Sequence, residues 1–453
     1  MVDIKVFFCI FFILFSTNCH TANSAQIIRD AEIELFLQKL INNIVQSSNK
    51  QNKKLYPRLI LDSNYNAFVT GTDKVYINTG LLQQAFSIDE VQGVLAHEIG
   101  HLFLKHHNSR LIDRQNKSKY SSLAAAASIA LTLAGKLDST AATGLLIGGQ
   151  DLALKSYLQF SRIQETQADS FALEMLRKSK ISSIGIKQLH KRLSEEEYLN
   201  KDLQSKYYRS HPFFKSRLDQ IERFESETSE TFKKTDHIYI YKRKINLQYI
   251  NNKITAYNKD PFNTLDKHAN QSNTLSRYAS TIAYLKVGKH DLGVNNLNDL
   301  LKKYKKYPFF YELLADIYYD KGDFELAILN YKIAQKMLSE DSDNSGTLIK
   351  FALAKSLLKT NETNNIKKAI IFLEEIIQVE PRWSYVWRLI AQGYGKVKKR
   401  GITFIALAEE SMIKKNFIKA KKYVGLALKD DTLTISYRLR GNDILARLNN
   451  RKR

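Results

Sequence analysis

His97 and His101 constrain this 453-residue chain more than any other feature, because they lie four positions apart with Glu98 directly after the first. On a helix of 3.6 residues per turn, this spacing places both imidazoles on one face. In a His-Glu-x-x-His arrangement the histidines bind zinc, and the glutamate takes a proton from the water that the metal activates. The spacing therefore predicts a helix that carries a catalytic site with one Zn²⁺ per chain.

The residues before this motif predict where its helix begins. Ser87, followed three positions later by Glu90, is a capping box, in which Ser87 accepts the amide of Glu90 and Glu90 reaches back. Val94 and Leu95 supply apolar neighbours ahead of the motif. We expect the helix to continue to about Lys105.

A catalytic zinc needs a third protein ligand and one open position. Glu165 is the best candidate for this ligand, and Asp169 follows it one helical turn later. Asp169 could accept the outer N–H of a ligating histidine and so fix its tautomer. The alternative is an i, i+4 pair on an ordinary polar helix face.

Residues 66–77 predict two short strands around a Gly-Thr-Asp turn, because β-branched and aromatic residues flank the turn formers. Such a hairpin beside the metal helix would offer an edge to an extended peptide. Asn66, Ala67 and Phe68 are the residues expected to align the substrate.

The second half of the chain shows an internal repeat. Tyr284 and Tyr318 are 34 residues apart, which is the period of the tetratricopeptide unit. Packing positions of this helix-turn-helix pattern recur at Leu314, Ala315, Tyr318, Ala327, Tyr331 and Ala334, at Ala354, Leu357 and Ala369, and at Ala408, Ala420, Val424 and Ala427. Stacked units would form a superhelix, and unrelated antiparallel helices are the alternative.

The length exceeds what one hydrophobic core can serve, so several units are expected. We predict a mainly α fold with a small β-sheet: a signal peptide at 1–25, a zincin-like metallopeptidase domain at 26–230, and an all-α tetratricopeptide superhelix at 240–453. The apolar run in the first segment is shorter than the roughly 20 residues that span a bilayer. A retained anchor is the alternative.

Both cysteines, Cys9 and Cys19, lie in this first segment. Its cleavage would leave no thiol for a disulfide, a metal or a nucleophile, which excludes cysteine proteases. The segment Leu123–Gly149 is apolar but interrupted by charges, which favours a buried helical hairpin over a lid or a membrane-touching loop.

A formal charge of +23 raises the question of nucleic acid. Basic residues are scattered along the whole chain, however, so a solvated basic surface is the favoured interpretation and nucleic acid is not an expected partner. Peripheral contact with an anionic membrane or an acidic partner is the alternative.

These motifs together resemble the periplasmic beta-barrel assembly-enhancing proteases, which are gluzincin metallopeptidases with C-terminal tetratricopeptide repeats. The resemblance spans nearly the whole mature chain. It rests on the Asn-Ala-Phe strand, Thr79-Gly80-Leu81-Leu82, the metal helix, the Ser-Arg-x-x-Glu-x-x-Ala-Asp segment beginning at Ser161, and Ser210-His211-Pro212 followed by Arg217.

The resemblance implies that His97, His101 and Glu165 bind zinc and that Glu98 is the base. It also implies that His211 lies in a loop near the metal, where it occupies the open position or assists the transition state. The implied substrates are unfolded or stalled outer-membrane proteins, and the implied partner of the repeats is the barrel-assembly machinery. A periplasmic location follows.

Two other functions are compatible with the sequence. One is a chaperone-like protein or scaffold that works through the repeats while the zinc site stays closed. The other is an integral-membrane zinc protease, which the lack of long apolar spans disfavours. The remaining histidines, among them His106, His107 and His190, match no motif, and surface or core roles are expected for them.

Overall fold

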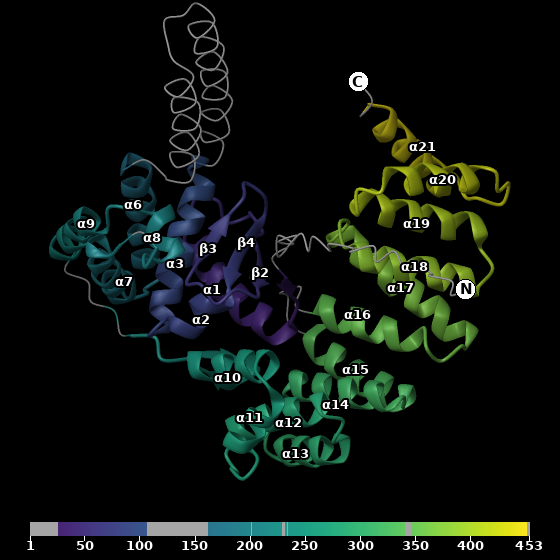
Figure 1. The fold of residues 1–453 in the computed structure, drawn as a ribbon, viewed down its shortest axis with the longest axis horizontal. Coiled ribbons are helices and arrows are strands. Elements are labelled where there is room, and N and C mark those ends of the chain that lie inside the picture. Colours follow the sequence, from purple (N-terminus) through teal and green to yellow (C-terminus); the bar gives the residue numbers. More distant parts are fainter. Residues whose placement is uncertain are drawn as a thin grey trace, which may run out of the picture.

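The computed structural model describes residues 26–106, 162–200, 202–228, 232, 234–339 and 346–450. The sequence predictions for the targeting segment 1–25, for the Leu123–Gly149 hairpin and for His107 lie outside these residues. Figure 1 shows a unit with a small sheet, coloured purple to teal, and an arc of helices, coloured teal to yellow. The predicted fold class, a metallopeptidase-type unit followed by all-α repeats, is confirmed.

A four-stranded sheet lies in the first unit, with the order β1-β2-β4-β3. Its strands are β1 (Ile27–Ile28), β2 (Tyr56–Ile60), β3 (Ala67–Val69) and β4 (Lys74–Asn78). β2 is parallel to β4, and the other pairs are antiparallel. The predicted hairpin is present: Phe68 pairs with Tyr76, and Gly71 turns the chain with a φ of 77°. β3 is an edge strand and packs against helix α3 (Ile88–Phe103).

The helices of this unit surround one buried helix. They are α1 (Ala31–Gln46), α2 (Thr79–Gln84), α3 (Ile88–Phe103), α6 (Arg162–Lys178), α7 (Ile184–Glu195), the 3₁₀ turn Glu196–Tyr198, α8 (Lys206–Ser210) and α9 (Phe214–Glu227). Every residue of α3 is buried, because α1, α6, α7 and β3 all pack against it. Side chains on any face of α3 are therefore shielded from water.

Both ends of α3 follow from local chemistry. Ser87 Oγ accepts the amide of Glu90 at 3.1 Å, as predicted. The Glu90 carboxylate reaches back to the amide of Phe86 at 3.1 Å rather than to that of Ser87. The helix ends at Phe103, before the expected Lys105, because Lys105 adopts a left-handed conformation with a φ of 60°.

A two-stranded hairpin, β5 (Ile238–Ile240) and β6 (Arg243–Ile245), precedes the repeats. The helices that follow are α10 (Leu247–Asn258), α11 (Pro261–His268), α12 (Thr274–Lys286), α13 (His290–Lys303), α14 (Pro308–Lys321), α15 (Phe324–Ser339), α16 (Gly346–Leu357), α17 (Thr363–Val379), α18 (Ser384–Lys396), α19 (Arg400–Ile413), α20 (Phe417–Leu428) and α21 (Ile435–Asn450).

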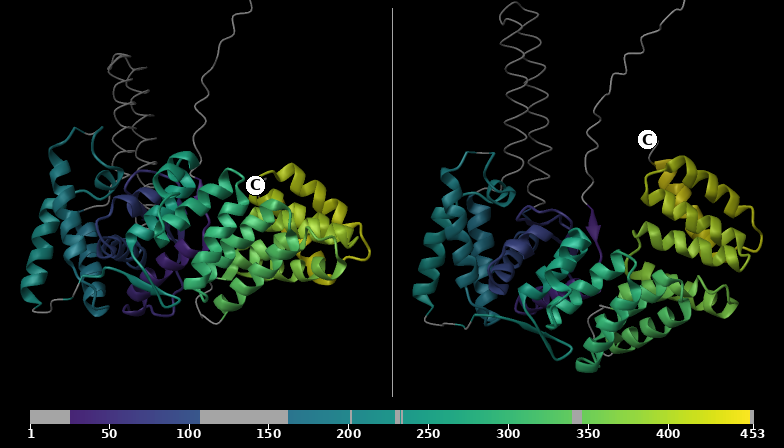
Figure 2. Two further views of the ribbon diagram at one scale, coloured as in Figure 1. Left: turned by 90° about the horizontal axis from the view of Figure 1, so that it is seen from below. Right: turned by 60° about the horizontal axis from the view of Figure 1, so that its bottom comes forward.

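From α12 onward, each helix packs against the next along the chain. Tyr284 and Tyr318 fall on α12 and α14, the first helices of successive pairs, as the 34-residue period predicts. Both views of Figure 2 show the repeats leading away from the sheet in chain order. The division of the chain between residues 230 and 240 stays a prediction; α9 ends at Glu227 and β5 begins at Ile238.

The repeats contact the first unit through the buried carboxylate of Glu32. The carboxylate of Glu32 on α1 accepts hydrogen bonds from Lys253 Nζ at 2.8 Å, from Tyr278 Oη at 2.8 Å and from the Tyr307 hydroxyl. Hydrophobic packing runs without a break from α1 to α19. The two units are therefore joined by continuous hydrophobic packing, although the length of the chain predicts separate cores.

A second ionic contact lies further along the repeats. Arg29 donates to both carboxylate oxygens of Glu380, at 3.1 and 2.7 Å, and Arg58 lies 3.0 Å from the same group. Among the described helices, none combines the length and the apolar character needed to cross a membrane.

Candidate metal centre

His97 and His101 project from the same face of α3. Their Nε2 atoms are 3.0 Å apart, and both side chains are buried. The helical spacing thus places two imidazole nitrogens at one point, as the sequence predicts.

Glu165 reaches these nitrogens from α6. Its Oε2 lies 3.3 Å from Nε2 of His97, and its Oε1 lies 3.5 Å from Nε2 of His101. Gly100 permits this approach, because a Cβ atom there would lie 3.1 Å from the carbonyl oxygen of Ala168 on α6. The small residue inside the motif thus brings the two helices close enough for Glu165 to join the histidines.

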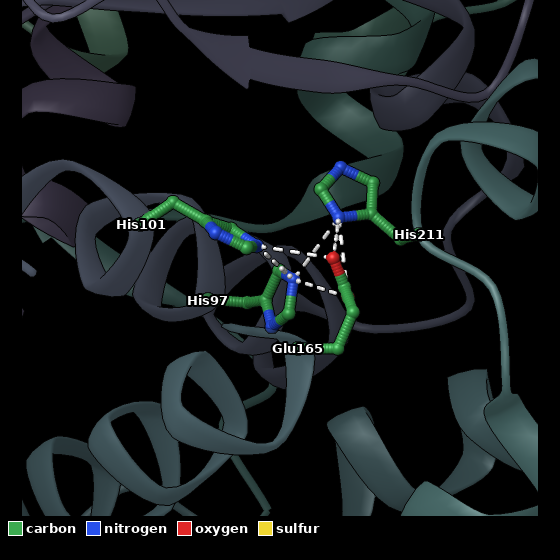
Figure 3. Close-up of side chains that lie close together, drawn as sticks. All are labelled: His97, His101, Glu165 and His211. Carbon is green, nitrogen blue, oxygen red and sulfur yellow. Dashed lines mark hydrogen bonds and ion pairs between the residues drawn. The ribbon is translucent and has the colours of Figure 1, made fainter. Parts of the chain in front are cut away.

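His211, at the end of α8, completes the cluster. Its Nδ1 lies 3.1 and 3.3 Å from the two oxygens of Glu165 and 3.3 Å from Nε2 of His97. The ring of Tyr207 lies against that of His211, with centroids 4.7 Å apart. The ligand atoms of His97, His101, Glu165 and His211 all fall within 4.8 Å of one another, and Figure 3 shows these four side chains pointing toward a common centre.

The donor set fits a zinc ion. Two buried imidazoles and a buried carboxylate, with the His211 nitrogen close by, match a catalytic zinc site with three fixed ligands and one exchangeable position. Three buried acidic side chains, Glu98, Glu165 and Asp169, lie in or beside the cluster, and the buried guanidinium of Arg217 contacts two of them, Glu165 and Asp169. A divalent cation would balance this excess of acidic groups.

The pKa shifts in the cluster agree with this fit. Burial alone would lower the pKa of His97, but its hydrogen bonds with Asp169 and Glu165 raise that pKa to about 9. The same negative surroundings would favour a metal ion at Nε2. Burial would raise the pKa of Glu165, yet His211 and Arg217 hold it well below its usual range. Burial lowers the pKa of His211 to about 4.

A second layer of side chains holds the first. Asp169 Oδ1 lies 2.8 Å from Nδ1 of His97, the contact that the sequence predicts. Arg217 on α9 donates to Asp169 through Nε at 2.6 Å and Nη2 at 2.8 Å. Its Nη1 also lies 2.7 Å from Oε2 of Glu165. Arg217 thus braces a predicted ligand and its neighbour, a role for which the sequence offered only its position after His211.

Two further histidines lie beside the site, although they match no sequence motif. Nδ1 of His106 is 2.9 Å from Nδ1 of His101, and Nε2 of His190 is 3.5 Å from Oδ2 of Asp169. His106 follows the end of α3, where helical spacing no longer relates one residue to another. Only the turn at Lys105 brings it back.

Glu98 borders the cluster, and the edge strand β3 packs against the helix that carries Glu98. Oε1 of Glu98 lies 3.4 Å from Nε2 of His211, and the carboxyl group is buried. On β3, Ala67 is buried, and Phe68 stacks on Tyr76 with ring centroids 5.0 Å apart. The carbonyl of Asn66 accepts the amide of Asn78 on β4 at 3.0 Å. Strand β3 thus keeps one main-chain edge without a strand partner among the described residues.

A buried His-Glu-x-x-His helix, a glutamate from a second helix and a sheet whose edge strand adjoins the first together define a zincin-type metallopeptidase. Residues 31–225 match the family model of Peptidase family M48. The site and this match together indicate a metalloendopeptidase that is similar to the M48 peptidases over these residues, and the cofactor of that family is zinc.

Relatives extend the likeness into the repeats. The chain is 21% identical over 388 residues to the beta-barrel assembly-enhancing protease of Yersinia pestis. The aligned residues cover 85% of this chain and 77% of that protein. It is 26% identical to a putative beta-barrel assembly-enhancing protease of Vibrio cholerae over 38% of this chain and 35% of that protein. It is also 28% identical to the mitochondrial metalloendopeptidase OMA1 of Schizosaccharomyces pombe, over 44% of this chain and 57% of that protein.

Proposed function

We propose that this protein is a periplasmic zinc endopeptidase that cleaves unfolded or stalled outer-membrane barrel proteins. The observation that carries the proposal is the buried cluster of His97, His101 and Glu165 with Glu98 beside it. In this proposal the three residues hold one zinc ion, and Glu98 is the catalytic base.

Zinc, when bound, supplies a Lewis acid that polarises a carbonyl group and lowers the pKa of a water molecule to about 7. Glu98 takes the proton of the attacking water and then passes it to the leaving amine. Asp169 accepts the Nδ1 proton of His97, which leaves Nε2 of that ring free to bind the metal. Arg217 keeps Asp169 charged and in place.

Strand β3 is proposed to align the substrate. An extended peptide would add to its open edge through main-chain hydrogen bonds, with Asn66, Ala67 and Phe68 opposite the peptide. Unfolded segments can adopt this extended form, and folded proteins cannot offer it without local unfolding. Selection of unfolded proteins would follow from this geometry.

The position of His211 supports a resting, closed state. Its Nδ1 lies with the three proposed ligands, where it would take the fourth position on the metal. Substrate would have to displace it before cleavage. The same observation favours a second candidate function, in which the site stays closed and the protein acts as a chaperone or scaffold through its repeats.

The partner and location rest on the relatives. Proteins named beta-barrel assembly-enhancing protease match 85% of this chain, repeats included. We infer that the repeats recruit substrate or the barrel-assembly machinery, and that the protein works in the periplasm, with the scattered basic surface allowing peripheral membrane contact.

The test compares two unfolded substrates of similar length with the full zinc-loaded chain: an outer-membrane barrel protein and a soluble protein. Faster cleavage of the barrel protein supports the proposal. Equal rates would contradict the substrate assignment, and cleavage of neither, with the substrates still held by the chain, would favour the scaffold.

A further inference from the structure

The two histidines of the His-Glu-x-x-His motif have different partners at their outer nitrogens. Nδ1 of His97 lies 2.8 Å from a carboxylate oxygen of Asp169, and Arg217 holds that carboxylate. Nδ1 of His101 lies 2.9 Å from Nδ1 of another imidazole, that of His106. The outer nitrogen of His97 therefore contacts a carboxylate, whereas that of His101 contacts another imidazole.

His106 reaches this place because the chain turns sharply after α3. Leu104 caps the helix through its amide to the carbonyl of Gly100 at 2.9 Å, and Lys105 then takes a φ of 60°. This turn folds His106 back against the last helical turn, where it is 5% exposed. The rings of His101 and His106 meet edge to face, with centroids 5.1 Å apart.

Metal binding at Nε2 of His101 determines which nitrogen atoms in this contact carry a proton. The inference therefore rests on the proposed zinc site. A neutral imidazole that gives its Nε2 lone pair to a metal carries its proton on Nδ1. Because the Nδ1 atoms of His101 and His106 face each other, His101 must donate and His106 must accept. The proton of His106 is then on Nε2, which lies 3.1 Å from Oε1 of Gln167.

We propose that His106 is the positioning residue of His101: it accepts the Nδ1 proton, fixes the ring orientation and tautomer that zinc requires, and is itself oriented by Gln167. Gln167 lies on α6, the helix that also carries Glu165. The relay therefore links the end of α3 to the helix of the third proposed ligand. His106 and Gln167 thus do for His101 what Asp169 and Arg217 do for His97.

A purely space-filling role for His106 makes a different prediction. If only its volume matters, any substitution that leaves a gap should be equally harmful. If the acceptor atom matters, asparagine should restore what alanine removes, because the side-chain oxygen of asparagine lies close to where Nδ1 of histidine lies. Loss of such an orienting partner typically weakens metal binding by about 10–100-fold.

The experiment measures the zinc dissociation constant of the full chain by competition with a chromophoric chelator, without substrate. The variants are His106→Ala, His106→Asn and Gln167→Ala. The control is Lys105→Gly, which keeps the left-handed turn because glycine adopts positive φ readily. Thermal unfolding of each metal-free chain reports any purely structural effect.

We expect His106→Ala to weaken zinc binding by about 10–100-fold. His106→Asn and Lys105→Gly should bind nearly as tightly as the parent. Gln167→Ala should show a smaller loss, since water can replace an exposed amide. Unchanged affinity in His106→Ala would overturn the inference, and so would an equal loss in His106→Asn. A parent chain that binds zinc but cleaves nothing would count against the proposed function alone, and a parent that binds no zinc would overturn both.

Discussion

Arg217 binds Asp169 with two nitrogen atoms, Nε at 2.6 Å from Oδ2 and Nη2 at 2.8 Å from Oδ1, and both side chains are buried. Asp169 in turn orients His97. A buried ion pair contributes little over an apolar pair, but the loss of one partner leaves an uncompensated charge. We therefore expect that replacing either Arg217 or Asp169 alone destabilises the proposed zinc site.

Arg217→Leu should lower the free energy of unfolding of the zinc-loaded chain by about 3–5 kcal/mol, because Asp169 would remain buried without its cation. Denaturant titration measures this loss. Arg223→Leu, an exposed position on the same helix, is the control and should change the free energy by less than about 0.5 kcal/mol. Similar effects of the two substitutions would argue against the bracing role.

The sequence predicted the parts of the site that lie within regular helices. The spacing of His97 and His101 and that of Glu165 and Asp169 both depend on the helical period, and the hairpin at Gly71 depends on turn chemistry. These local rules also placed Ser87 at the start of α3.

Contacts that depend on tertiary packing could not be predicted in the same way. The closeness of Arg217 to Asp169 requires α9 to pack on α6, and no pattern in either segment specifies that. His106 depends on a non-glycine residue, Lys105, in the left-handed region, which residue type alone does not favour. The burial of Glu32 among side chains of the repeats likewise appears only in three dimensions.

Lys253→Met tests the junction between the two units. It would leave the Glu32 carboxylate buried without its cation, so we expect a loss of about 3–5 kcal/mol and an earlier calorimetric transition. The exposed Lys259→Met is the control. Adding Glu32→Gln to Lys253→Met should recover part of the loss, because no buried charge then remains alone. A transition unchanged by Lys253→Met would show that the junction does not need this charge.

His211→Ala should keep its zinc, because His97, His101 and Glu165 remain. Cleavage of an unfolded protein should become faster, since the proposed fourth position opens. Zinc analysis and initial rates measure the two effects. The double variant Glu98→Gln/His211→Ala must be inactive if the gain arises at this site. Slower cleavage by His211→Ala, with zinc retained, would instead make His211 an aid to the transition state.

Asp316 should give the stability a specific pH dependence. Burial raises the pKa of this carboxyl group to about 6 from its ordinary value of 3.8, although Tyr331 donates a hydrogen bond to it and opposes the rise. Between these values the folded chain holds a proton that the unfolded chain has released. Stability should therefore fall as the pH rises from 3.8 to about 6.

Asp316→Asn removes this ionisation and should stabilise the chain at pH 8 by about 1–2 kcal/mol, less than the full shift implies because the side chain is only partly buried. The gain should shrink as the pH falls and vanish below 3.8. The exposed Asp266→Asn is the control. A gain of the same size at every pH would contradict the titration of Asp316.

The central claim is that Glu98 performs catalysis at a zinc ion held by its helix, and one paired measurement tests it most directly. Zinc content and cleavage of an unfolded protein are determined for the parent chain and for Glu98→Gln. We expect one zinc per chain in both, with cleavage reduced by about 10²–10⁴-fold in Glu98→Gln. Equal cleavage by the two chains, or a parent without zinc, would contradict the account.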